Sequence, residues 1–146
     1  MPEPAQLVVY HKHPTSARLR FLRHAHGGIC AAAPLPAAAR IETGACAPDA
    51  ANGNGAVRAH PGMLLRGVEA ALALPRGCIE PDGAFRCHVV ADGGCAEVLL
   101  ARFRDIDPPF DEASAVGADF IDLTDARRLP AAELMLLRLA YEHVLG

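Results

Sequence analysis

Short apolar runs separated by polar or glycine-rich stretches predict the secondary structure of this chain. Residues 7–13 are predicted to form a strand. Leu7 and Val9 alternate there with Val8, so both faces of the strand are apolar. A strand of that kind is typical of a central position in a sheet that is covered on both sides.

Two interpretations fit residues 16–26. A helix could begin at Ser16, whose hydroxyl can accept a hydrogen bond from a free N–H of the first turn, and end at the glycine pair 27–28. The alternative is a strand in which apolar and basic residues alternate over residues 18–21. Because Leu22 breaks that alternation, the helix is the preferred interpretation.

The middle and the end of the chain carry clearer signals. A helix is predicted for residues 61–74 and another for residues 130–145, each from apolar residues at helical spacing after a proline. Residues 84–91 and 95–103 predict a hairpin around an Asp-Gly-Gly turn. A short strand is expected around residues 40–46.

Three connecting segments complete this map. Two Asn-Gly steps and the lack of large apolar side chains predict a mobile loop at about residues 48–55. Two prolines exclude a helix from the acidic link 105–112. Residues 120–123 are a candidate for one extra short strand.

The expected order is therefore β-α-β-α-β-β-α in a single globular domain spanning residues 1–146, an α/β fold. This order matches a thioredoxin-like arrangement, which is favoured over a ferredoxin-like α+β sandwich. Val-Tyr-His-Lys-His-Pro at residues 9–14, followed by Ser16 and Arg18, also resembles the first strand and turn of glutathione transferases. The turn lacks the redox cysteines of thioredoxins, so thiol redox chemistry is not implied.

Composition narrows the functional classes. Hydrophobic residues make up 51% of the 146 residues and charged residues 21%, which is enough apolar side chain for a packed core. The formal net charge of −3 argues against nucleic-acid binding, and no apolar run is long enough to cross a membrane. The abundance of alanine and arginine is typical of a GC-rich, bacterial genome. No export signal is evident and the five cysteines include no close pair, so we expect a cytoplasmic protein with free thiols.

Two His-x-His pairs are the first candidate site. His11 and His13 would share one face of a strand, and His24 and His26 could approach each other beyond a helix end. If the two segments are neighbours, these imidazoles could hold a divalent metal such as zinc, iron, nickel or manganese. Ordinary histidines at the ends of a strand and a helix are the simpler interpretation.

The segment Leu-Arg-His-Ala-His-Gly at residues 22–27 resembles the Leu-Arg-His segment of the histidine phosphatase superfamily. The resemblance implies that His24 would be the nucleophile that becomes phosphorylated. It also implies that Arg23 would hold the phosphate oxygens, a task that suits a guanidinium group. These two residues are the candidate catalytic groups.

The last helix suggests association instead of catalysis. Its stripe of core residues is joined by Met135, Leu136 and Leu139, which a single sheet cannot all cover. We therefore expect a homodimer through this helix, unless the link 105–123 folds over it. The functional expectation is a non-catalytic binding or self-associating module. The alternative is a metal-binding or phosphate-handling protein built on the two histidine pairs.

Overall fold

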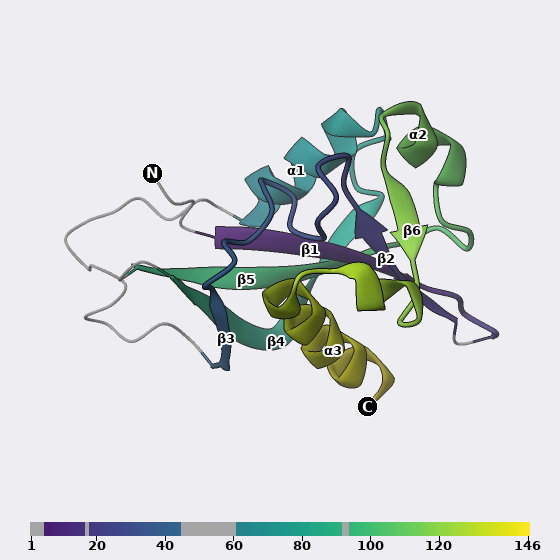
Figure 1. The fold of residues 1–146 in the computed structure, drawn as a ribbon. Helices are drawn as coiled ribbons and strands as arrows, with labels where there is room; N and C mark the ends of the chain where they lie inside the picture. The colour runs from purple at the N-terminus through teal and green to yellow at the C-terminus, as the bar shows by residue number, and fades with distance from the viewer. Residues whose placement is uncertain (1–4, 17, 45–60, 92–93) are drawn as a thin grey trace.

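A single mixed sheet of six strands, with helices on both of its faces, makes up the fold (Figure 1). The computed structural model describes residues 5–16, 18–44, 61–91 and 94–146. The elements in chain order are β1 (Ala5–Lys12), β2 (Leu19–Arg23), β3 (Arg40–Thr43), α1 (Pro61–Ala71), β4 (Ile79–Ala91), β5 (Gly94–Phe103), α2 (Phe110–Ala115), β6 (Asp119–Ile121), the 3-10 helix η1 (Asp125–Arg128) and α3 (Ala131–Leu145).

The strand order is β3-β4-β5-β1-β2-β6, and every neighbouring pair is antiparallel except β1 with β5. Figure 1 shows α1 and α2 on one face of the sheet and α3 on the other. The α/β class is confirmed. None of the described helices has the length and apolar composition needed to cross a membrane.

Residues 19–23 form β2, so the helix predicted over residues 16–26 is wrong. Phe21 packs in the apolar cluster on the α3 face of the sheet, and Leu22 packs in the cluster on the α1 face. A strand covered on both faces needs apolar residues on both. The break in alternation at Leu22 therefore marks a doubly buried strand.

The order of the first elements changes as a result. The chain turns back from β1 into the antiparallel β2, where the predicted order β-α-β-α-β-β-α requires a helical crossover. A third strand, β3, also precedes the first helix. The thioredoxin-like arrangement is therefore not confirmed, although the sheet does carry helices on both faces.

The other predicted elements are confirmed as β1, β3, α1, the β4–β5 hairpin, β6 and α3. One boundary was wrong, because α2 begins at Phe110 inside the link from which a helix was excluded. Proline disfavours a helix at the residue before it, yet a helix can start directly after it, as α2 does after Pro109. The loop predicted at residues 48–55 lies outside the described residues.

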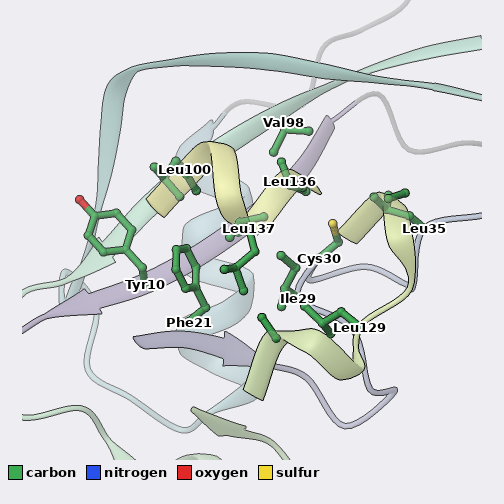
Figure 2. Packing of buried hydrophobic residues seen from close by; sticks show 14 of the residues in the cluster. Tyr10, Phe21, Ile29, Cys30, Leu35, Val98, Leu100, Leu129, Leu136 and Leu137 are labelled. Atoms are coloured by element: carbon green, nitrogen blue, oxygen red, sulfur yellow. The ribbon is translucent and has the colours of Figure 1, made fainter. Parts of the chain in front are cut away.

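The apolar cluster on the α3 face lies between the sheet, α3 and the segment of residues 28–35 (Figure 2). Leu136 and Leu137 of α3 are fully buried, and Val98 of β5 lies on the sheet side of the cluster. The segment of residues 28–35 contributes Ile29, Cys30 and Leu35 to the same cluster. The expectation that Leu136 would be left uncovered is wrong, because this segment supplies apolar cover in addition to the sheet.

A buried carboxyl group joins that segment to α3. Glu133, in the first turn of α3, is fully buried and accepts hydrogen bonds from the backbone N–H of Ile29 at 2.7 Å and of Leu35 at 3.4 Å. Backbone N–H groups and the positive end of a helix both favour an acidic group at this place. A Cβ atom at Gly28 would lie 2.5 Å from Glu133 Oε1, so a glycine is needed where the segment passes the carboxyl group.

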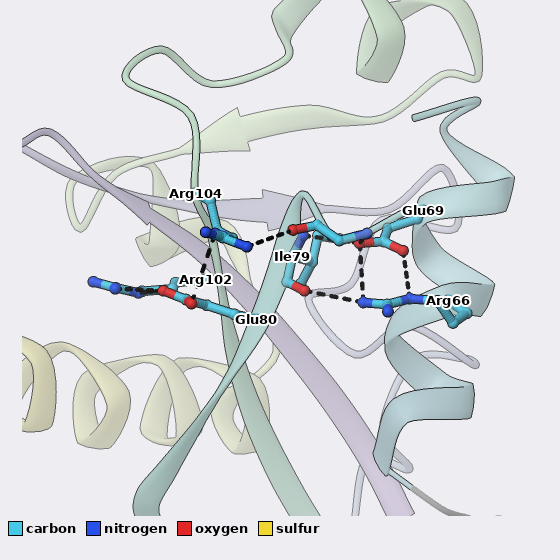
Figure 3. Close-up of polar contacts among 7 residues, drawn as sticks. Arg66, Glu69, Ile79, Glu80, Arg102 and Arg104 are labelled. Atoms are coloured by element: carbon cyan, nitrogen blue, oxygen red, sulfur yellow. Dashed lines mark hydrogen bonds and ion pairs between the residues drawn. The ribbon is translucent and has the colours of Figure 1, made fainter. Parts of the chain in front are cut away.

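A second buried carboxyl group joins α1 to the sheet (Figure 3). Glu69 of α1 accepts hydrogen bonds from the N–H of Gly77 at 3.0 Å and of Ile79 at 2.9 Å. It also pairs with Arg66, whose guanidinium donates to the Ile79 carbonyl at 3.1 Å. These contacts tie the helix to the beginning of β4.

Replacing Glu133 tests the anchor on α3. In Glu133→Leu the N–H of Ile29 would be buried without a partner, so we expect the free energy of unfolding to fall by about 1–3 kcal/mol. Glu133→Gln retains an acceptor oxygen and should lose less. Urea denaturation measures both. Glu142→Ala, an exposed change on the same helix, is the control and should stay within about 0.5 kcal/mol of the wild type. Equal stabilities for Glu133→Leu and the control would contradict the anchor.

Candidate functional site: a cavity beside α1

A cavity of about 590 Å³ lies between α1, the beginning of β1 and the segment that follows β2. Its volume is within the range of small-molecule binding sites. The lining residues of the described chain include no Asp, Glu, Lys or Arg. His24, His26 and Gln6 are the polar residues among them, and the rest are alanine, glycine or large apolar residues.

Small side chains from three segments line part of the cavity. On the sheet side, Ala5 of β1 precedes Leu7 on the α1 face. On the helix side, Gly67 and Ala71 are one turn apart and both are exposed. Ala31 contributes another short side chain from the segment after β2. Leu and Val residues of α1 fill the deeper part, while these small residues leave the outer part open.

The rim of the cavity exposes large apolar side chains. Met63 of α1 is 71% exposed and Val116, at the end of α2, is 45% exposed. Both line the cavity. Folded proteins rarely expose contiguous apolar surface. An apolar cavity with an apolar rim is therefore typical of a binding site.

His24 is, with Gln6, one of two polar lining residues that have a buried side-chain atom without a hydrogen-bond partner among the described residues. It follows β2 directly, its side chain is partly buried, and Nε2 is shielded from solvent without a hydrogen-bond partner in the described residues. The ring stacks on His26 with 5.5 Å between centroids. Burial, and secondarily the neighbouring His26, lower the pKa of His24 from 6.5 to about 4, so its ring is neutral at pH 7.

His26 has a structural task. Its Nδ1 accepts a hydrogen bond from the N–H of Gly28 at 3.0 Å, and its Nε2 donates one to the carbonyl of Cys30 at 2.8 Å. Both ring nitrogens are therefore used to hold the turn that follows β2. The structure brings His24 and His26 together, as predicted, but His26 has no free nitrogen to offer a metal ion.

The other predicted pair is not joined to the first. His11 is fully buried in β1 and its Nε2 donates to the carbonyl of Asp105 at 2.9 Å. His13 lies beyond the end of β1, where its Nδ1 accepts from the N–H groups of Thr15 and Ser16, each at 3.3 Å. Among the described residues, no group of three or more His, Cys, Asp or Glu side chains is arranged to hold a metal ion. Metal binding by either pair stays a prediction.

Arg23 forms an ion pair with Asp119. Its Nε and Nη2 donate to the two carboxylate oxygens of Asp119 in β6, at 2.9 and 2.5 Å. This bidentate ion pair uses the guanidinium face that the phosphatase resemblance would assign to a phosphate group. The role of Arg23 and His24 in phosphate chemistry stays a prediction.

The cysteines are poor candidates for nucleophiles. Cys30 and Cys87 are free and buried, and burial raises the pKa of both thiols, that of Cys87 to about 12. Cys78 is also free, and partial burial raises its pKa. Cys95 is disulfide-bonded, so the expectation of free thiols throughout is wrong for this residue.

A second hollow, of about 690 Å³, lies near the carboxyl ends of β1 and β5. Its lining is charged, but the charges are largely matched within the chain. Arg102 and Arg104 both pair with Glu80 (Figure 3), and the lining also holds one further residue of each sign, Lys12 and Asp105. Solvated and internally paired charges of this kind indicate an ordinary polar surface.

No protein-family model matches the chain, and no curated protein is significantly similar to it. The resemblances to glutathione transferases and histidine phosphatases therefore rest on the short segments quoted above.

Sequence reasoning singled out His24 and His26 but missed the cavity around them. Residues 5–7, 24–32 and 63–72 build most of it, and no motif links these segments. One signal was available: Gly67 and Ala71 place two small residues on one face of the helix predicted over residues 61–74.

The low pKa of His24 makes a testable contribution to stability. Between pH 6.5 and 4 the unfolded chain binds a proton at His24 that the folded chain does not, so the free energy of unfolding falls as the pH is lowered through this range. His24→Leu removes this contribution. We expect the variant to lose less stability than the wild type between pH 7 and pH 5, measured by urea denaturation. Equal losses would contradict a neutral, desolvated His24.

Proposed function

We propose that this chain is a non-catalytic binding module that takes a small, largely apolar ligand in the cavity beside α1. The observation that carries the proposal is a cavity of about 590 Å³ whose described lining has no charged side chain and whose rim exposes Met63 and Val116. Burial of this apolar surface by a ligand is favourable by roughly 25 cal/mol per Å².

The residues around the cavity support binding more than catalysis. His26 is committed to the turn after β2, which leaves His24 as the imidazole available to a ligand. Among the described residues, the lining has no carboxylate, thiol or hydroxyl that could act with it as an acid, a base or a nucleophile. A single neutral imidazole in an apolar wall is suited to orienting a ligand.

The cavity can be blocked without disturbing the core. N-phenyl-1-naphthylamine, an uncharged dye whose emission rises in apolar surroundings, should bind the wild type at one site. A Cβ at Gly67 meets no atom within 4 Å, so Gly67→Leu should fold normally while its side chain fills the cavity. We expect the affinity for the dye to fall at least about tenfold, a change of 1.4 kcal/mol.

Ala70→Leu is the matched control, because Ala70 is an exposed neighbour on α1 that does not line the cavity. This variant should bind the dye like the wild type. Circular dichroism and thermal denaturation would establish that both variants are folded. Undiminished dye binding by a folded Gly67→Leu would contradict the proposed site.

Self-association through α3 is a second proposal, and Met135 and Leu145 favour it. They are 49% and 40% exposed, and they are large apolar side chains on one short helix. A two-fold contact between copies of α3 would cover them. The contact would be smaller than the sequence suggested, because Leu136 is used inside the chain.

Light scattering at micromolar concentration tests this second proposal. We expect a dimer in the wild type and a monomer in Met135→Glu, since an interface cannot bury an unpaired carboxylate cheaply. Met63→Glu, an equivalent change at the distant cavity rim, should remain dimeric. A monomeric wild type, or a dimer that Met135→Glu leaves intact, would exclude the α3 interface.

A further inference from the structure

We infer that the ligand of the cavity is an uncharged molecule with a hydrogen-bonding group, such as a hydroxyl or an amide, that pairs with the imidazole of His24. This inference rests on the proposed function, since it names the chemical class of the ligand for the same site. Such a ligand has a large apolar body and a polar end.

The apolar body follows from the wall of the cavity. The described lining residues carry no formal charge, and the charged residues next to them in the chain form two internal ion pairs, Arg23 with Asp119 and Arg66 with Glu69. A ligand that brought its own charge would lose its water and find no partner of opposite charge. Carboxylates, phosphates and ammonium groups are therefore selected against.

The polar end follows from the state of His24. No hydrogen bond of its ring is present in the described residues, and Nε2 is shielded from solvent, whereas both nitrogens of the adjacent His26 are used. An unpaired, desolvated nitrogen is unfavourable, and a ligand that pairs it recovers that free energy. The His24 ring stacks on His26. Because Nε2 is shielded in this conformation, pairing with a ligand requires the ring to turn about its Cβ–Cγ bond when the ligand enters.

A hydroxyl group fits this site whichever tautomer the ring adopts. Neutral imidazole has one nitrogen that donates a hydrogen bond and one that accepts, and a hydroxyl can do either. A primary amide has the same property. An aliphatic or aromatic hydrocarbon of equal size would fill the cavity but leave the imidazole unpaired.

Three probes with one skeleton separate these contributions. Naphthalene, 2-naphthol and 2-naphthoate are each used to displace N-phenyl-1-naphthylamine from the wild-type protein at pH 7. We expect 2-naphthol to bind about 3- to 10-fold more tightly than naphthalene, the worth of one net hydrogen bond. The ionised 2-naphthoate should bind at least about tenfold more weakly than 2-naphthol.

Two variants assign the preference to His24. In His24→Leu the preference for 2-naphthol over naphthalene should fall, because the leucine has no polar group. His24→Gln keeps a donor and an acceptor and should retain part of the preference for 2-naphthol. Circular dichroism shows whether each variant is folded, and the glutamine variant alone tests the assignment if the leucine variant is not.

The outcomes distinguish this inference from the proposed function. If naphthalene displaces the dye as well as 2-naphthol does, or if His24→Leu leaves the preference unchanged, the cavity stands and the role of His24 is wrong. Tightest binding of 2-naphthoate would overturn the uncharged class. If the dye does not bind, or Gly67→Leu does not block it, the proposed function fails and the inference fails with it.

Discussion

The carboxyl group of Glu133 joins α3 to the segment of residues 28–35, and this segment forms part of the wall of the proposed site. It accepts the N–H of Ile29 and of Leu35 inside the core, which fixes both ends of the segment between them. One side of this segment packs against α3 through Ile29 and Cys30. The adjoining Ala31 and Ala32 line the cavity on the other side of the fold. The shape of the cavity therefore depends on hydrogen bonds of Glu133, a residue that does not line the cavity.

Glu69 performs the equivalent task on the opposite face of the sheet. It joins α1, the other wall of the cavity, to Ile79 at the start of β4 and to Gly77 just before it, through their N–H groups. Each helical layer is thus fastened by one buried carboxyl group whose backbone partners offset the cost of burying it. Two walls that are held independently leave the space between them open, since neither can collapse onto the other without breaking its anchor.

The parts of the fold that sequence patterns predict are those whose periodicity is undisturbed by neighbours. The β4–β5 hairpin and the helices α1 and α3 follow from turn residues and helical spacing that local physics dictates. β2 could not be distinguished from a helix, because Phe21 and Leu22 face two different cores that only the assembled sheet creates. The six residues of α2 are too few for a period to emerge.

The candidate site was less predictable for a related reason. His24 and His26 were recognisable as a pair, but which nitrogen each one uses depends on backbone groups at Gly28 and Cys30 that the turn brings back to them. Glu133 could not be recognised as an anchor, because an acidic residue in the first turn of a helix is usually solvated. A cavity made from small residues of three separate segments has no pattern of its own in the sequence.

Hydrogen exchange at the amide of Ile29 tests the central claim most directly. If Glu133 fixes the segment that forms the cavity wall, this amide should exchange only when the whole protein unfolds, at a rate like that of the central strand β1. The amide of Ala33, an exposed residue of the same segment, should exchange far faster. Rapid exchange of Ile29, at the rate of Ala33, would show that the wall opens freely, and would contradict an account in which the buried carboxyl group determines the shape of the site.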